Sequence, residues 1–430
     1  MAKNRRDIDS LSAAELSDYI HALDVLRQRS ETNPDDPAGY VFQAGLHNDF
    51  FIGPCEHGSD LFLPWHRAHL HYFEKLLQEA DPPRTANVTI PYWDWIDPEP
   101  NSKFPPAFDE QGLFADGRNT NRSTPLPPDT LAIVTGETSW PRFGGFPQGS
   151  EDGDFGRLEF GPHNTMHPSF IGGLMANPGT AAEDPIYYSF HCFIDLLWAE
   201  WQRRNGTPPA TSPDSDLRGF DSQPKHKVKD FQDTEALDYV YEYSDKLKEA
   251  FGIHAPPPPP PPEPPELRTT EPLEPVFEQG VARAISDAER LEYRVPAVKE
   301  GAEAAVRVRV KVPTKGSYTL HGYLHPADVP FDRDDSEFAE RYYVGYASAW
   351  QSHEMPEGGG GDEARAAHPY HPPYLTARFD VTKALAAAGG SDQILTLDWV
   401  AAPSPSGART ATADLADEVA VEDVAVEVYG

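Results

Sequence analysis

The stretch CEHGSDLFLPWHRAHLHYFE, residues 55–74, places four histidines and one cysteine beside an apolar run. Over residues 63–80 the apolar side chains recur at helical spacing, which predicts an amphipathic helix. Such a helix either exposes its histidines to solvent or presents them to a metal ion. The other histidines of the chain decide between these two interpretations.

The size and charge of the chain limit its architecture and partners. A chain of 430 residues exceeds the size at which one core keeps growing, so we expect two domains. The formal net charge of -33 argues against nucleic acid or an anionic membrane as a partner, because both would repel the protein. The sequence shows no run of about 18 apolar residues and no apolar stretch near its start, so we expect no spanning helix, no secretory signal and a cytoplasmic location. Cys55 and Cys192 are the only cysteines, too few for a disulfide scaffold.

A proline-rich segment divides the chain. Residues 255–275 contain a run of seven prolines, which predicts a stiff, solvated spacer. Residues 1–254 have helical periodicity, and residues 276–430 change to a period of two, which predicts a β-sandwich with a mobile loop at 357–373. Helices are predicted over residues 12–28 (after a Ser12 cap), 63–80, 184–204 and 233–251, and strands over residues 304–312, 317–324, 341–350, 374–381, 393–401 and 419–429.

Six of the 16 histidines fall into two groups of three at suggestive spacings: His47, His57 and His66, and then His163, His167 and His191. His163 and His167 are four residues apart, so a helix would point both imidazoles the same way, as two ligands of one metal require. An all-imidazole set, without a carboxylate cluster or a Cys-x-x-Cys motif, suits copper, zinc, iron or nickel and disfavours magnesium or calcium.

Four segments carry a close family resemblance. HGSDLFLPWHRAHLHYFE, IPYWDW, GPHNTMH and DPIYYSFHCFIDLLWAEWQ resemble the two copper signatures of the type-3 copper proteins, which are tyrosinases, catechol oxidases and molluscan haemocyanins. The resemblance covers roughly the first 250 residues and implies a mainly α fold, a four-helix bundle with two copper ions in its core. It assigns one copper to His47, His57 and His66, and the other to His163, His167 and His191. Spacing alone does not exclude His69; only the resemblance selects His66.

Two local features qualify this resemblance. Many family members have two adjacent histidines where this chain reads Phe190-His191, so only the second, liganding one is retained. The Cys55-x-His57 pattern resembles fungal tyrosinases and haemocyanins, in which a thioether joins the sulfur to the imidazole. The alternative is that Cys55 is a small buried thiol.

The resemblance implies copper-dependent oxidation of phenols by dioxygen. The expected reactions are ortho-hydroxylation of monophenols and oxidation of o-diphenols to quinones. We expect o-aminophenols as further substrates of the oxidation. Glu159 stands four residues before His163, where plant polyphenol oxidases place a water-holding glutamate, and Asn164 follows that histidine. The two would polarise a water that takes the phenolic proton; the alternative is a surface charge and a helix-start residue. Ala181 and Ala182, near a bulky gate of some relatives, would leave room for the ring.

The C-terminal part resembles the β-rich domain of plant and fungal polyphenol oxidases. That resemblance implies a domain that covers the copper site and keeps the enzyme latent until it is removed; the alternative is a domain that only stabilises or assists copper loading. Other open functions are a catechol oxidase without monophenolase activity, a haemocyanin-like oxygen binder and a zinc hydrolase. We expect dioxygen and small phenols as partners, no nucleic acid and no membrane.

Overall fold

A computed structural model describes the chain in two compact units, a first over Met1–Pro261 and a second over most of Pro262–Gly430. The described residues are 2–47, 54–96, 104–110, 112–119, 129–147, 155–208, 213–253, 267–275, 291–298, 302–311, 318–332, 335–349, 374–388, 391, 393–401 and 421–429. The proline run 256–262 and the predicted mobile loop 357–373 lie outside them.

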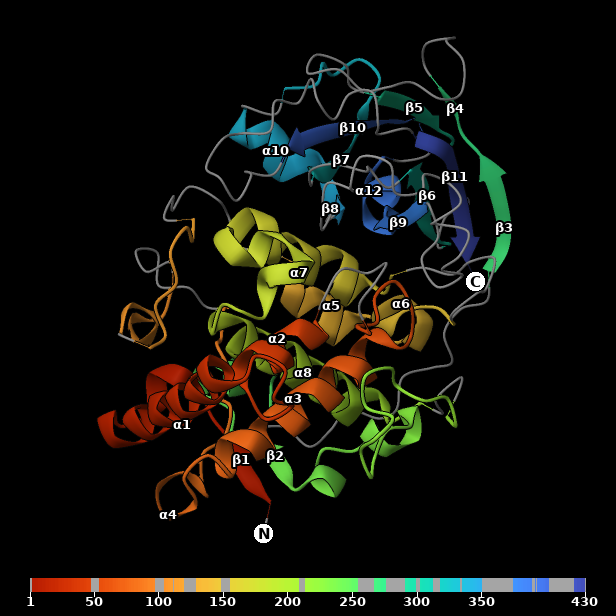
Figure 1. The fold of residues 1–430 in the computed structure, drawn as a ribbon. Helices are drawn as coiled ribbons and strands as arrows, with labels where there is room; N and C mark the ends of the chain where they lie inside the picture. Colours follow the sequence, from red (N-terminus) through yellow and green to blue (C-terminus); the bar gives the residue numbers. More distant parts are fainter. Residues whose placement is uncertain are drawn as a thin grey trace, which may run out of the picture. The chain divides into compact units, whose positions relative to one another are not determined.

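The first unit is mainly helical (Figure 1). Its α-helices are α1 (Ala13–Thr32), α2 (Tyr40–Leu46), α3 (Phe62–Gln78), α4 (Pro82–Thr85), α5 (Thr130–Gly136), α6 (Trp140–Gly144), α7 (Pro178–Ala181), α8 (Ile186–Asn205) and α9 (Asp245–Ala250). Its 3-10 helices are η1 (Ile8–Ser10), η2 (Pro106–Asp109), η5 (Gly173–Ala176), η6 (Val228–Phe231) and η7 (Glu235–Leu237), and its π-helices are η3 (Glu159–His163) and η4 (Met166–Ile171). The short strands β1 (Lys3–Arg5) and β2 (Tyr239–Tyr241) pair in parallel.

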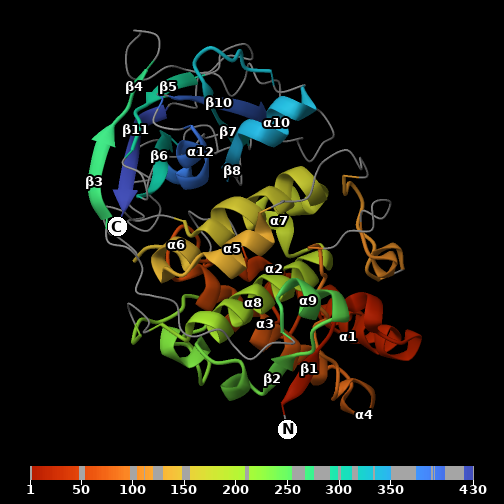
Figure 2. The same cartoon turned by 180° about the vertical axis from the view of Figure 1, so that it is seen from behind.

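Three predicted helices form as their periodicity indicates. The prediction over residues 12–28 is α1, and Ser12 caps it in a reciprocal capping box with Glu15. Helices α3 and α8 correspond to the predictions over residues 63–80 and 184–204. These two helices pack against each other and lie side by side in both views (Figures 1 and 2). Helix α3 carries His66, and helix α8 carries His191.

The helix predicted over residues 233–251 is wrong. The segment instead contains η7, strand β2 and α9. Asp238 adopts a left-handed conformation with φ of 65°, which ends the first turn. The following residues leave the helical path because Tyr239–Tyr241 pairs with β1 from the other end of the unit. A long-range strand contact therefore overrides the local helical pattern.

A buried ionic network fixes these strands onto α3 and α8. Arg67 on α3 donates from Nε to Asp195 Oδ1 on α8 at 2.5 Å. The hydroxyls of Tyr239 and Tyr241 donate to Asp195 Oδ2 at 2.6 and 2.5 Å. The Arg5 guanidinium lies 3.6 Å above the centroid of the Tyr239 ring. A buried carboxylate with this many donors is stabilised, and the loss of one partner of a buried pair is costly.

The second unit consists of two sheets and short helices. Among the described residues its strands are β3 (Leu267–Pro272), β4 (Glu274–Pro275), β5 (Leu291–Val295), β6 (Glu303–Lys311), β7 (Tyr318–Pro326), β8 (Tyr343–Ala349), β9 (Tyr374–Asp380), β10 (Gln393–Ala401) and β11 (Val421–Tyr429), with helices α10 (Ser336–Tyr342) and α12 (Thr382–Ala387). The described strands form one sheet in the order β4-β5-β10-β7-β8 and another in the order β3-β11-β6-β9. The fold class, a helical unit followed by a β-sandwich, is confirmed.

In this unit, a phenylalanine of one sheet packs against two glycines of the other sheet. Phe379 of β9 packs on Gly322 of β7 and Gly345 of β8, where an added Cβ would lie 3.2 and 3.3 Å from its ring. One sequence boundary differs: residues 267–275, assigned to the spacer, form β3 and β4. Both are edge strands. A proline is tolerated there because its missing N–H can face the side of the strand that has no neighbour in the sheet.

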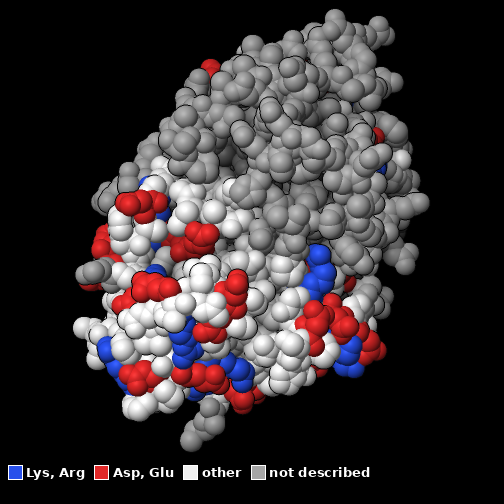
Figure 3. All heavy atoms as spheres, viewed as in Figure 1, with Lys and Arg blue, Asp and Glu red and all other residues white. Residues whose placement is uncertain are grey.

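The surface of the first unit carries mixed charges. On the face shown in Figure 3, basic side chains lie among acidic ones. Ion pairs join Lys227 to Asp216 and Lys229 to Asp214 in this unit. Among the described residues, no helix combines the length and the apolar character needed to cross a membrane.

Candidate metal centre

The structure brings all six predicted histidines together in the core of the first unit. They come from four helical segments and one loop: His47 follows α2, His57 lies in the loop before α3, His66 is on α3, His163 ends η3, His167 is in η4, and His191 is on α8. All six side chains are buried. The four segments α2, α3, η3–η4 and α8 thus each carry or adjoin at least one histidine of the centre.

The pair His163 and His167 differs from the prediction of one regular helix. The two lie in successive π-helical segments, and Pro162 and Pro168 stand beside them without backbone N–H donors. π-helical turns are rare and are frequently found at functional sites. The ring centroids are 4.6 Å apart, so the two imidazoles still point to one place.

Each predicted group of three is compact. In the first group, Nε2 of His57 lies 3.4 Å from Nε2 of His47, and the His57 and His66 ring centroids are 4.9 Å apart. In the second group, Nε2 of His167 lies 3.1 Å from Nε2 of His163 and 3.3 Å from Nε2 of His191.

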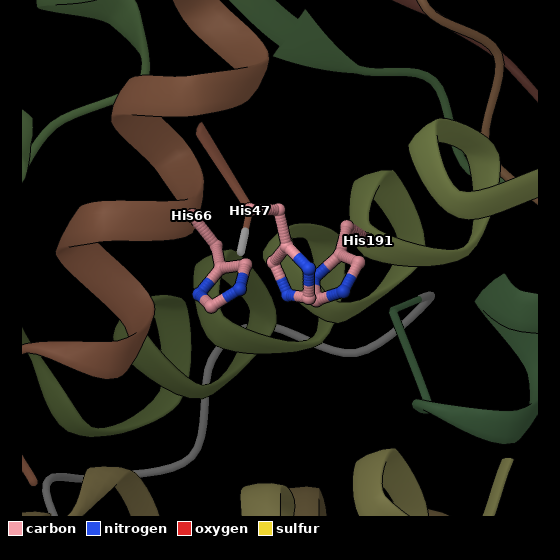
Figure 4. A group of neighbouring side chains, drawn as sticks. All are labelled: His47, His66 and His191. Atoms are coloured by element: carbon pink, nitrogen blue, oxygen red, sulfur yellow. The ribbon is translucent and has the colours of Figure 1, made fainter. Parts of the chain in front are cut away.

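The two groups also face each other. His66 and His191 stack with ring centroids 4.4 Å apart and planes at 5°. One ring nitrogen from each of His47, His66 and His191 lies within 4.8 Å of the others, and Figure 4 shows these rings next to one another. The same limit joins His163, His167 and His191. His191 therefore stands between the two groups.

Hydrogen bonds at Nδ1 fix the orientation of five of the six rings. Three Nδ1 atoms donate to backbone carbonyl oxygens: His47 to Pro178 (3.0 Å), His66 to Phe62 (2.8 Å) and His167 to Met175 (3.0 Å). A carbonyl oxygen can only accept, so the proton of these neutral rings is on Nδ1 and the lone pair is on Nε2. For His191, the described residues offer Nδ1 no hydrogen-bond partner.

The other two Nδ1 atoms are held by Glu159 and Asn164. His57 Nδ1 lies 2.9 Å from Glu159 Oε1, and the Gly58 N–H donates to the same carboxylate at 3.0 Å. His163 Nδ1 lies 2.8 Å from Asn164 Oδ1. Burial raises the pKa of Glu159 well above its usual range. Glu159 thus contacts an imidazole of the first group and Asn164 an imidazole of the second, and sequence spacing did not reveal the contact between Glu159 and His57.

The donor set fits a metal ion bound by imidazoles. Burial lowers the pKa of His47 to about 4 and that of His163 to about 3, so both rings are neutral at pH 7. His163 Nδ1 donates to an amide oxygen and His167 Nδ1 to a carbonyl oxygen, so their Nε2 lone pairs face each other at 3.1 Å and repel unless a cation lies between them. The His57–His47 and His167–His191 Nε2 atoms are 3.4 and 3.3 Å apart. Nitrogens bound about 2.0 Å from one tetrahedral ion lie about 3.3 Å apart, which these separations match. Nε2 of His66 is buried and has no hydrogen-bond partner among the described residues, which a metal ion would supply.

Neighbouring residues surround the centre without joining it. His69 has both nitrogens engaged, Nδ1 with the Tyr187 hydroxyl at 3.1 Å and Nε2 with the Gln43 carbonyl at 3.0 Å, so neither is open to a metal. Phe190 packs its ring 4.9 Å from that of His167. Cys55 is fully buried in an apolar cluster that includes Trp65.

Ala181 and Ala182 are also fully buried, at the end of α7. The structure therefore places both small residues in the packed interior of the unit. The room for a substrate ring that the sequence predicts beside them stays a prediction.

Comparisons with known proteins agree with this geometry. Residues 19–131 and 107–204 match the common central domain of tyrosinase. The chain is 32% identical over 247 residues to the tyrosinase of Streptomyces antibioticus, covering 48% of this chain and 85% of that protein. It is 31% identical over 297 residues to tyrosinase HcTyr1 of Hahella sp. (strain CCB-MM4), covering 56% of this chain and 63% of that protein. It is 28% identical over 287 residues to a chloroplastic polyphenol oxidase of Vitis vinifera, of which the match spans 42%.

Solved structures share the fold along the whole chain. Latent aurone synthase, a polyphenol oxidase, has a TM-score of 0.66 at 17% identity and covers 100% of this chain and 90% of its own. A functional unit of octopus hemocyanin has a TM-score of 0.58 at 16% identity, with 99% of both chains covered. The matched domain, the bacterial relatives and the imidazole centre place the chain in the tyrosinase family of type-3 copper proteins.

Proposed function

We propose that this protein is a copper-dependent phenol oxidase that uses dioxygen. Its centre would hold two copper ions, one at His47, His57 and His66 and the other at His163, His167 and His191. The substrates would be monophenols, which are hydroxylated, o-diphenols, which are oxidised to quinones, and o-aminophenols, which are oxidised to quinone imines. The observation that carries the proposal is the pair of facing all-imidazole groups. Within each group, neighbouring Nε2 atoms lie 3.1 to 3.4 Å apart.

The chemistry divides between the metal and the chain. Copper ions bound there would supply dioxygen binding and electron transfer. The balance is simple: two diphenols and one dioxygen give two quinones and two waters, and one monophenol and one dioxygen give one quinone and one water. The imidazoles stay neutral in the dry core and hold their Nε2 lone pairs in place, so that little reorganisation is needed during the reaction.

Glu159 and Asn164 would handle the phenolic proton. A phenol with a pKa near 10 is almost wholly protonated at neutral pH, so hydroxylation needs a base at the site. Glu159 is one hydrogen bond from His57, and Asn164 is one from His163, so the two flank the centre from both groups. We propose that they hold a water between them which accepts this proton.

Two further features complete the proposal. Cys55 would form a thioether with His57: the thiol hydrogen and one ring-carbon hydrogen are lost, and the two electrons pass to dioxygen. The second unit would restrain activity until it is removed, with residues 1–254 as the catalytic domain and a spacer beginning at 255. The proline run supports this proposal, since linkers of this kind are where proteases cut.

Replacing one ligand in each group tests the two-copper assignment. His66→Ala or His167→Ala should lower bound copper to about half of wild type and abolish nearly all oxygen uptake, because two imidazoles do not hold the ion. His69→Gln is the matched control, since its ring nitrogens bind protein groups, and it should keep wild-type copper. Metal analysis and an oxygen electrode provide both readouts. Full copper content in either alanine variant would contradict the assignment.

The thioether predicts a mass change. After loading with copper and exposure to air, the peptide containing Cys55 and His57 should be about two hydrogens lighter than its sequence mass, because forming the bond removes the thiol hydrogen and one ring-carbon hydrogen. Denatured protein kept without copper is the control and should react fully with an alkylating agent. Complete alkylation of Cys55 in the copper-loaded, aerated protein would rule out the bond.

Glu159→Gln and Asn164→Ala should slow tyramine hydroxylation on the order of 100-fold, the usual value of a positioned base, and slow 4-methylcatechol oxidation much less. Copper content is measured in parallel because both residues contact ligands. Glu183→Gln, at an exposed glutamate, is the control and should leave both rates unchanged. Equal losses on both substrates would reject the proton role.

The wild-type protein itself distinguishes the alternative functions. If it oxidises catechols but not monophenols, it is a catechol oxidase, and if it binds dioxygen without turnover, it is an oxygen carrier.

Latency is tested by cutting the chain in its proline run. A specific protease site introduced between residues 255 and 262 lies before β3, so both units stay intact. Cleavage should raise diphenol turnover with copper retained, because the second unit would then be able to dissociate from the centre. The unmodified chain treated with the same protease is the control. A turnover that stays equal or falls would show that the second unit stabilises the enzyme rather than restrains it.

A further inference from the structure

The turn formed by residues 217–220 contacts residues next to each of the three histidines of the first group. It lies beyond the matched tyrosinase domain, which ends at residue 204. We propose that this turn is a clamp that positions His47, His57 and His66, with Arg218 and Gly219 as its positioning residues. The inference rests on the proposed copper centre and extends it to residues that contact the neighbours of the metal ligands.

The strongest contact is an ion pair with the residue before His57. Arg218 Nε donates to Glu56 Oε1 at 2.7 Å, and the Glu56 side chain is 3% exposed. Arg218 Nη2 also donates to the backbone oxygen of Cys55 at 3.4 Å. A buried carboxylate that loses its charged partner is strongly unfavourable, so the loop would move to bring Glu56 to water. His57 would move with it.

Gly219 gives the clamp its close approach. Its φ of +83° is a conformation that residues with a side chain rarely adopt. A Cβ there would lie 3.0 Å from Cβ and Cγ of Pro54 and 3.5 Å from Cδ2 of Leu46. Pro54 precedes the Cys55 loop, and Leu46 directly precedes His47. The backbone of the turn therefore rests against two ligand-bearing segments at once.

The third segment is reached through Trp65. Its Nε1 donates to the Arg218 backbone oxygen at 2.9 Å, and its ring centroid is 4.9 Å from that of the next residue, His66. Leu217 and Phe220 belong to the same buried cluster as Cys55 and Trp65. Four adjacent residues of the turn thus bear on the segments of all three histidines in the first group.

Glycine substitution gives the cleanest test. Gly219→Ala adds a methyl group against Pro54, whereas Gly206→Ala adds one at a similar φ of +81° with nothing within 4 Å. Both variants place an alanine at a similar positive φ, and they differ in the contact that the added methyl group meets. With a competing chelator, Gly219→Ala should release one of its two coppers about tenfold faster than wild type, the loss typical of a disturbed outer partner. Gly206→Ala should release both at wild-type rates.

A second pair of variants tests the ion pair. Arg218→Met should act as Gly219→Ala does, and Arg218→Lys, which restores one charged contact, should lie between it and wild type. Arg203→Met is the matched control, because Arg203 is a partly exposed arginine on the buried Glu200 near the end of α8. Its copper release should equal that of wild type. Thermal unfolding of the metal-depleted proteins shows whether the variants fold equally well.

The site affected is identified in two one-copper backgrounds. In His167→Ala, which retains the first group, Arg218→Met should accelerate release of the remaining copper about tenfold. In His66→Ala, which retains the second group, it should have no effect. Equal acceleration in both backgrounds, or in neither, would overturn the clamp while leaving the copper centre standing. A wild-type chain that takes up no copper would contradict both proposals.

Discussion

The hydrogen bond at Nδ1 is the constraint on which the centre depends. A neutral imidazole carries one proton, and a backbone carbonyl that holds it at Nδ1 commits the lone pair to Nε2. His47, His66 and His167 are all turned this way by carbonyl oxygens at 2.8 to 3.0 Å. Because the oxygens belong to secondary structure, ring orientation is set by the fold itself. The fold therefore prepares a converging set of lone pairs before any metal is bound.

Such a set is unfavourable without a cation, so a rigid frame must hold it. Helix α3 carries His66 of the first group, and helix α8 carries His191 of the second. The buried pair of Arg67 and Asp195 joins the two helices beside these histidines. Arg67 directly follows His66, and Asp195 lies one helical turn after His191. The hydroxyl of Tyr239 adds a third element to the same carboxylate. The frame and the centre thus share the same two helices.

Sequence predicts the parts of this molecule that depend on local pattern. Helices α3 and α8 follow from apolar spacing, and the six histidines follow from their spacing together with a family resemblance. Contacts between distant segments have no such signal. Glu159 lies 102 residues from His57, and Tyr239–Tyr241 pairs with a strand at the start of the chain. The latter contact converts a helical pattern into a strand, because pairing and the buried Asp195 outweigh local propensity.

Local pattern also fails where two rules compete. The prolines of residues 267–275 indicate a spacer, yet this stretch forms edge strands that tolerate proline. The spacing of His163 and His167 indicates one helix, yet the chain there is π-helical and contains Pro162. At His163 and His167 the sequence locates the feature correctly but does not determine its backbone, whereas at residues 267–275 it places the end of the spacer too late. The turn at residues 217–220 gives no motif at all, since its role arises only from what it packs against.

Anomalous diffraction at the copper edge from copper-loaded crystals tests the centre most directly. We expect two peaks within one centre, the first about 2 Å from Nε2 of His47, His57 and His66, and the second about 2 Å from Nε2 of His163, His167 and His191. A single peak shared through His191, a peak bound at Glu159 rather than at the imidazoles, or no copper at these histidines would contradict the assignment of two three-imidazole copper sites.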